Sequence, residues 1–186
     1  MPTRDAAHRP TLDTERLTLV ALAAADLDAW LTGDAAALAR GVGARFPGPA
    51  DLPPLFGEDM PWFRARLRKR PTALGWGVWI ILLRTGGVPV GVVGFLGEPD
   101  AEGRFGFGYS VYPEHTRQGY ATEAARGALA WAFAQPGALL ARATIPPWNT
   151  ASLRVAEKLE MQRAGTAQDE EVGEVLVFEK GTSGAG

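Results

Sequence analysis

The chain has 186 residues and a mass of 19.8 kDa, which predicts a single domain. Apolar residues make up 46% and charged residues 22% of the chain, which is typical of a globular protein and excludes wholesale disorder. The 19 basic and 21 acidic residues give a formal net charge of −2. Because an electrostatic nucleic-acid binder is basic, we expect no DNA partner.

The composition also removes several kinds of chemistry. Cysteine is absent, which excludes disulfides, thiolate zinc sites and cysteine nucleophiles. Only His8 and His115 could serve a histidine-based metal site or a serine triad, so we expect no metal. No apolar run reaches eighteen residues, and the acids before the apolar stretch 17–25 do not fit a signal peptide. We therefore predict a cytoplasmic protein with no membrane partner.

Flexible ends and an ordered middle are predicted from the distribution of polar and small residues. Residues 1–11 and 181–186 have no period and are expected to be flexible, which leaves 12–180 as one domain.

The first half of this domain is predicted as one strand, two helices and a loop. The loop, residues 46–56, holds four prolines and is expected to fold over a site. The strand is expected at 17–22, one helix at 26–40 with Asp26 as its cap, and an amphipathic helix at 58–70.

The second half shows the clearest hairpin, in which the apolar runs 77–84 and 88–96 flank a Gly-Gly turn. Further elements are predicted as a strand at 104–111, a helix at 121–134, a strand at 139–145, a helix at 150–160 and a strand at 172–179. This order predicts a mixed α/β fold with a partly antiparallel sheet.

The stretch 111–125, VYPEHTRQGYATEAA, carries the clearest chemical signal. A strand ends here, and a turn containing Gly119 opens an alanine-rich helix. A helix N-terminus presents free N–H groups and partial positive charge, which suit an anion such as phosphate. Gly119 would let the backbone approach a phosphate and Arg117 would add charge. An ordinary strand-to-helix connector has the same pattern, so these residues alone leave both interpretations open.

Three segments of the chain resemble the Gcn5-related N-acetyltransferase (GNAT) superfamily. Residues 111–124, with the string RQGYATEA, resemble its motif A. Residues 14–19, TERLTL, and 149–159, NTASLRVAEKL, are similar to two signatures of the branch of ribosomal-protein N-terminal acetyltransferases (RimJ/RimL-like). The segments follow the family's order, and the resemblance covers about residues 12–180.

The resemblance implies an α/β (α+β) fold with a mostly antiparallel, bent sheet flanked by helices. Two central parallel strands, at 106–111 and 139–145, would splay apart and hold the co-substrate acetyl-CoA. Its diphosphate would lie on the N–H groups of residues 117–122, its pantetheine along 110–112, and its thioester near Asn149 and Ser152. The implied site comprises Ser110, Val111, Tyr112, Arg117, Gln118, Gly119, Tyr120, Ala121, Thr122, Asn149 and Ser152.

The implied reaction is transfer of acetyl to a primary amine, either a peptide α-amino group or a small-molecule amine, by direct attack. An α-amine has a pKa near 8, so about a tenth is already neutral at pH 7 and no strong base is required. The partners implied are acetyl-CoA and an amine acceptor, and a homodimer is left open.

Three positions depart from the family pattern. Thr116 stands where relatives have Gln or Arg, Ala156 where many have a tyrosine that protonates the thiolate, and Gly106 where a carboxylate is common. Ser152 is therefore the candidate catalytic side chain. These departures leave two alternatives open, namely a non-catalytic acyl-CoA-binding module and a transferase using another acyl-CoA such as succinyl-CoA. The basic residues of 64–70 could meet an acidic partner or the CoA 3′-phosphate, or simply favour a helix end.

Overall fold

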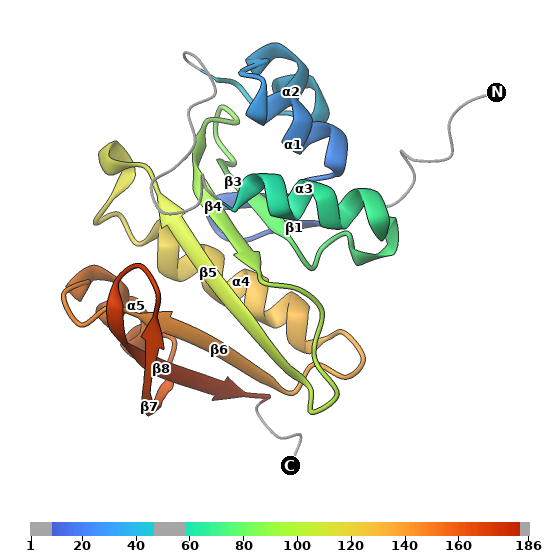
Figure 1. The fold of residues 1–186 in the computed structure, drawn as a ribbon. Coiled ribbons are helices and arrows are strands. Elements are labelled where there is room, and N and C mark those ends of the chain that lie inside the picture. The colour runs from blue at the N-terminus through green and yellow to red at the C-terminus, as the bar shows by residue number, and fades with distance from the viewer. Residues whose placement is uncertain (1–8, 47–58, 183–186) are drawn as a thin grey trace.

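The computed structural model describes residues 9–46 and 59–182 and contains one open eight-stranded sheet, in the order β1-β2-β3-β4-β5-β6-β8-β7 (Figure 1). The strands are β1 (Thr11–Asp13), β2 (Leu17–Ala21), β3 (Val78–Leu83), β4 (Pro89–Phe95), β5 (Arg104–Val111), β6 (Leu140–Ile145), β7 (Gln162–Asp169) and β8 (Gly173–Gly181). The helices are α1 (Ala24–Leu31), α2 (Ala35–Val42), α3 (Met60–Lys69), α4 (Tyr120–Phe133) and α5 (Thr150–Lys158), and two short 3₁₀ turns span Pro71–Ala73 and Pro113–His115.

The neighbouring strands are antiparallel except for β5 and β6, which are parallel and are connected through α4. This arrangement confirms the predicted fold class. The longest helix of the described residues, α4, has 14 residues, and none of these helices is long and apolar enough to cross a membrane.

Helices cover both faces of the sheet and create two apolar cores (Figure 1). Strand β3, with the sequence VWIILL, serves both, because alternate side chains point to opposite faces. Val78 and Ile80 pack with α1, α2 and α3, whereas Trp79 and Ile81 pack on the side of α4. A central strand with two buried faces must be apolar throughout, which is why this hairpin is so clear in the sequence.

Small side chains bring α4 close to the sheet. Its buried positions are mostly alanines, including Ala124, Ala125, Ala128 and Ala132, each fully buried. Beyond them, the Trp131 ring packs against Trp79 at a centroid distance of 5.0 Å. Because α4 is fixed against the sheet along its length, its N-terminus has a defined place at the end of β5.

The prediction for the first helical region differs from the structure in the number of helices and in the residue at the N-cap. The single helix expected at 26–40 is wrong, since the Asp34 carboxylate caps a second helix by accepting from the Ala37 N–H at 2.9 Å. Asp26 is not the N-cap residue but the third residue of α1. It still contributes to the cap, because its carboxylate accepts from the N–H of the N-cap residue Ala23 at 2.7 Å, and it pairs with Arg9 at 2.9 Å.

Two strands, β1 and β7, are missing from the sequence prediction. Every residue of β7 is exposed, so its sequence lacks the apolar alternation that marks a half-buried strand. It is held instead by backbone pairing with β8.

The predicted flexible ends overlap with ordered residues. Arg9 is ion-paired, Thr11 begins β1 and Gly181 ends β8, while residues 1–8 and 183–186 lie outside the described residues. Most of the predicted loop at 46–56 lies outside them too. The domain boundaries stay a prediction.

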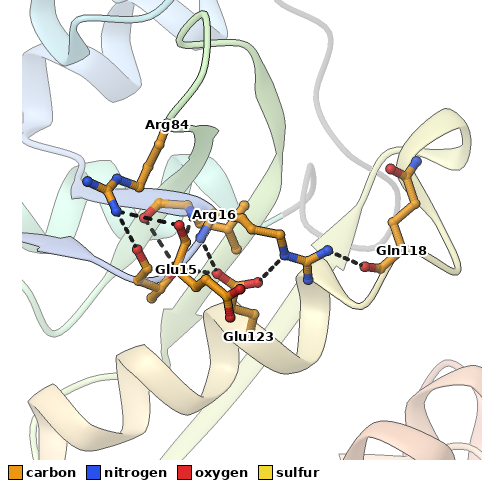
Figure 2. Close-up of polar contacts among 7 residues, drawn as sticks. Glu15, Arg16, Arg84, Gln118 and Glu123 are labelled. Carbon is orange, nitrogen blue, oxygen red and sulfur yellow. Dashed lines mark hydrogen bonds and ion pairs between the residues drawn. The ribbon is translucent and has the colours of Figure 1, made fainter.

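A polar cluster ties the turn between β1 and β2 to the first turn of α4 (Figure 2). The Glu123 carboxylate accepts from the Thr14 hydroxyl at 2.6 Å, and from both the Arg16 backbone N–H and the Arg16 Nε at 2.7 Å. Arg16 also donates to the Gln118 carbonyl oxygen at 2.9 Å and lies over the Tyr120 ring. Residues 14–19, which resemble a signature of the RimJ/RimL-like branch, therefore position α4, the helix that follows β5.

Two features of the environment of Glu123 have opposite effects on its pKa. Burial raises the pKa, but the hydrogen bonds from Thr14 and Arg16 and the charge of Arg16 outweigh burial and hold it below the ordinary value of 4.5. The charged carboxylate is therefore the form that stabilises the fold.

We expect Glu123→Gln to lower the free energy of unfolding at pH 7 by roughly 1–2 kcal/mol, because it removes a charge-assisted cluster. Because the pKa of Glu123 is lower in the folded protein, the charged carboxylate stabilises the fold at pH values above its ordinary pKa. This stabilisation is lost as the pH falls through the pKa of the folded state. The difference between wild type and variant should thus close below pH 4.5. Urea unfolding across pH checks this, with the exposed Glu170→Gln as control. A constant difference down to pH 3 would contradict it.

Candidate active site

The two parallel strands β5 and β6 separate after a short contact. They pair only over Arg104–Gly106 and Leu140–Arg142. Beyond that point β5 stays paired with β4 as far as Val111, and β6 stays paired with β8 as far as Ile145. The sheet therefore splits into two halves, as the resemblance implies, and the N-terminus of α5 lies at the split.

A groove of about 620 Å³ opens between the end of β5 and the N-termini of α4 and α5; we call it the α4 groove. It brings together nine of the eleven predicted site residues, namely Ser110, Val111, Arg117, Gly119, Tyr120, Ala121, Thr122, Asn149 and Ser152.

Two predicted site residues do not line the α4 groove. The Gln118 side chain turns back to the Glu114 carbonyl oxygen at 3.3 Å, and the Tyr112 backbone N–H donates to Val90. Figure 2 shows Gln118 at the turn that precedes α4. The Gln118 contact lies within the turn, whereas the Tyr112 contact joins the end of β5 to the start of β4.

The turn before α4 is shaped to present backbone N–H groups. Arg117 has a φ of 59° and Gly119, the N-cap of α4, has a φ of 83°, so the chain passes twice through the left-handed region. Gly119 has no side chain with which to cap the helix. The first N–H groups of a helix have no intrahelical acceptor, and such a turn forms a concave anion-binding surface.

The side chains of the α4 groove add positive charge. Arg117, Arg154 and Lys158 line it, with His115 beside them, and none of its lining residues within 9–46 and 59–182 is acidic. Arg154 and Lys158 lie four residues apart and share one face of α5. Sequence reasoning missed Arg154, although this spacing could have identified it. The groove therefore favours an elongated ligand with several negative charges.

The basic residues of 64–70 do not line this groove. Arg66 and Arg70 pair with Glu98 at 3.0 and 3.2 Å, and Arg64 and Arg68 pair with Asp28 at 3.5 and 2.7 Å. Each of the two acids holds two arginines on this surface, away from the α4 groove, so we assign these arginines no contact with a phosphate there.

A second, smaller cavity of about 210 Å³ lies between the separated strands; we call it the β5–β6 pocket. Its walls are largely apolar and include Phe107, Ile145 and Met161. Three residues line both cavities, namely Tyr109, Asn149 and Ser152. These residues mark the junction at which a ligand in the groove would meet a ligand in the pocket.

The junction is built on the start of α5. The Asn149 side-chain oxygen accepts from the Ser152 N–H at 3.1 Å and caps the helix. The Tyr109 hydroxyl donates to the Ser152 carbonyl oxygen at 3.4 Å. Burial raises the pKa of Tyr109 and outweighs the opposing hydrogen bond with Ser152, so the phenol keeps its proton at neutral pH.

Tyr109 is a further functional candidate that the sequence analysis did not identify. It shares a face of β5 with Phe105 and Phe107, because strand side chains alternate. The sequence carried a signal for this position, since a tyrosine follows two phenylalanines at two-residue spacing and so lies on the same face of the strand.

The structure shows the surroundings of the three residues that depart from the family pattern. Thr116 lines the α4 groove, with its hydroxyl donating to the Pro113 carbonyl oxygen at 2.9 Å. Ala156 is buried against the β5–β6 pocket. A Cβ atom on Gly106 would lie 2.9 Å from Leu96 Cδ1, so any side chain there must displace Leu96.

The fold and these cavities define an acetyltransferase of the GNAT class, and comparison with known proteins agrees. Residues 16–162 match the family model described as an acetyltransferase (GNAT) domain. The chain belongs to this family, which confirms the resemblance found in the sequence.

Individual relatives support the same assignment. The uncharacterized N-acetyltransferase YjdG of Bacillus subtilis is 35% identical over 104 residues, a match that spans 56% of this chain and 62% of that relative. A solved acetyltransferase from Agrobacterium tumefaciens is 30% identical, with a TM-score of 0.63 over 93% of this chain and 95% of its own. RimL, a ribosomal L7/L12 α-N-protein acetyltransferase solved with coenzyme A, shares the fold at 14% identity, with a TM-score of 0.64 over 92% of this chain and 98% of its own.

We expect Asn149→Ala to lower the free energy of unfolding by about 1 kcal/mol, because it removes the cap of α5. Asn149→Asp keeps an acceptor for the Ser152 N–H and should stay within a few tenths of the wild-type value. Thermal unfolding of the two variants checks this. Equal stability of Asn149→Ala and Asn149→Asp would show that the cap contributes nothing.

Proposed function

We propose that this acetyltransferase is an acetyl-CoA-dependent N-acetyltransferase that acetylates a primary amine by direct attack. The observation that carries the proposal is the meeting of a cationic groove with an apolar pocket at Tyr109, Asn149 and Ser152. The coenzyme A bound in the RimL structure supports the choice of donor. The residues present fit this ligand, because the α4 groove offers both backbone N–H groups and basic side chains.

In this proposal, the diphosphate of acetyl-CoA lies on the N–H groups of residues 117–122 at the start of α4. Arg154 and Lys158 supply charge for the phosphates along α5. The pantetheine follows the end of β5 past Ser110 and Val111, which places the thioester at the junction. Gln118 and Tyr112 serve only through their places in the backbone of the turn and strand.

The chemistry follows from what the junction holds. A neutral amine in the β5–β6 pocket attacks the acetyl carbonyl carbon, the C–N bond forms, and the C–S bond breaks. We propose that the Tyr109 hydroxyl gives its proton to the leaving sulfur, while the nitrogen loses its extra proton to water. Solvent then restores the Tyr109 proton. Ser152, the candidate from the sequence, is kept as a second donor or relay.

The alternative donor succinyl-CoA is disfavoured by charge. Its terminal carboxylate would need a cation near the acyl end, and the part of the chain that the structure describes places no Lys, Arg or His in the lining of the β5–β6 pocket. The non-catalytic alternative is tested by turnover: release of free thiol from acetyl-CoA in the presence of an amine panel supports an enzyme. A tight acetyl-CoA complex with no thiol release would establish a binding module instead.

We expect Gly119→Trp to weaken acetyl-CoA binding at least about tenfold, because an indole would occupy the surface where the diphosphate meets the helix. A residue with a side chain is also strained at this φ, so Gly137→Trp is the matched control. Gly137 has a φ of 80°, has open space around its Cβ position and lies beyond the far end of α4. Equal affinity of the two variants would refute the proposed diphosphate site.

We expect Tyr109→Phe to lower kcat by about 100-fold with little change in acetyl-CoA affinity, because general acid catalysis contributes about 10²–10⁴ in rate. Ser152→Ala should lower kcat less. Steady-state kinetics with calorimetric binding checks both variants. An unchanged kcat in Tyr109→Phe beside a large loss in Ser152→Ala would return the proton-donor role to Ser152.

A further inference from the structure

The β5–β6 pocket differs in chemistry from the α4 groove, and this difference bears on the acceptor. Its walls are largely aliphatic and aromatic, with Leu96, Phe107, Ile145 and Met161 among them. Its volume of about 210 Å³ lies below the roughly 300–1,000 Å³ of pockets for drug-sized ligands. A compact apolar group fits such a space, whereas a long or highly polar one would lose hydration without recovering it.

One carboxylate faces this apolar pocket. Among the described residues that line it, those of 9–46 and 59–182, only Asp59 and Tyr109 are ionisable, and the tyrosine is neutral at pH 7. Asp59 precedes α3 at its N-cap position, but its side chain makes no cap hydrogen bond, and it has no ion-pair partner in the described part of the chain. The nearby acid Glu98 is different, since Arg66 and Arg70 hold it.

We infer that the acceptor is a primary amine with one positive charge and a compact apolar group beside it, and that Asp59 binds its ammonium form. This inference rests on the proposed N-acetyltransferase function. Asp59 gathers the cation at the pocket, and the apolar walls receive the neighbouring group. The bound ammonium gives one proton to water, and the resulting neutral amine is the nucleophile of the proposed reaction. A polyamine is disfavoured, because its further charges would meet an apolar wall in which the described residues place no second carboxylate.

Two sources offer this chemistry, a free alkylamine and a peptide whose first residue is apolar. Wild-type kinetics with isopentylamine, ethanolamine and spermidine tests the free amines, and short peptides beginning with Met or Lys test the N-termini. We expect kcat/KM for isopentylamine to exceed that for ethanolamine and spermidine, or the Met peptide to exceed the Lys peptide, at least about tenfold. Whichever pair shows turnover identifies the source.

The role of Asp59 is tested by Asp59→Asn, which removes the charge and keeps a good N-cap residue. We expect KM for the preferred amine to rise about tenfold, with unchanged acetyl-CoA affinity and unchanged thermal stability. Glu170→Gln, which removes an exposed charge from the turn between β7 and β8, should leave the KM unchanged.

The outcomes separate this inference from the function on which it rests. Preferred turnover of spermidine or ethanolamine, or an unchanged KM in Asp59→Asn, would overturn the inference while leaving the transferase activity intact. Absence of turnover with every amine and peptide, despite acetyl-CoA binding, would overturn the proposed function and this inference with it.

Discussion

The separation of β5 from β6 after Gly106 and Arg142 is the constraint on which the rest of the site depends. Beyond the split, β5 is paired with β4 over Phe107–Val111 and β6 with β8 as far as Ile145, so each half of the sheet is held by its own pairing. The start of α5 lies at the opening and is fixed there by the Asn149 cap. A continuous parallel sheet would leave no passage between the α4 groove and the β5–β6 pocket.

Charge is divided between the two cavities in a way that suits two different substrates. Counting the residues that the structure describes, the α4 groove carries Arg117, Arg154 and Lys158 with no acid, whereas the β5–β6 pocket is largely apolar with one carboxylate. An anionic donor and a cationic acceptor would therefore sort themselves to opposite sides before they meet at Tyr109. The Glu123 cluster holds the turn between β1 and β2 against α4. The α4 groove is therefore held in place by contacts remote from the junction.

Sequence reasoning predicted most of the fold because its strongest signals came from burial. Strand β5 matches its expected range of 104–111, since alternating burial leaves a readable pattern, whereas the exposed β7 leaves none. The α4 groove was predictable because Gly119 and the helix start are adjacent in sequence. Tyr109 and Asp59 were not, because their roles arise from cavities formed by distant strands. The cytoplasmic location and the homodimer stay predictions.

The central claim is that the divided sheet seats acetyl-CoA with its thioester at the junction. A crystal structure of the protein with coenzyme A tests this most directly. The account predicts the diphosphate on the first turn of α4, the pantetheine beside the end of β5, and the sulfur within reach of the Tyr109 hydroxyl. Coenzyme A bound on another face, or with its sulfur directed away from Tyr109, Asn149 and Ser152, would contradict it.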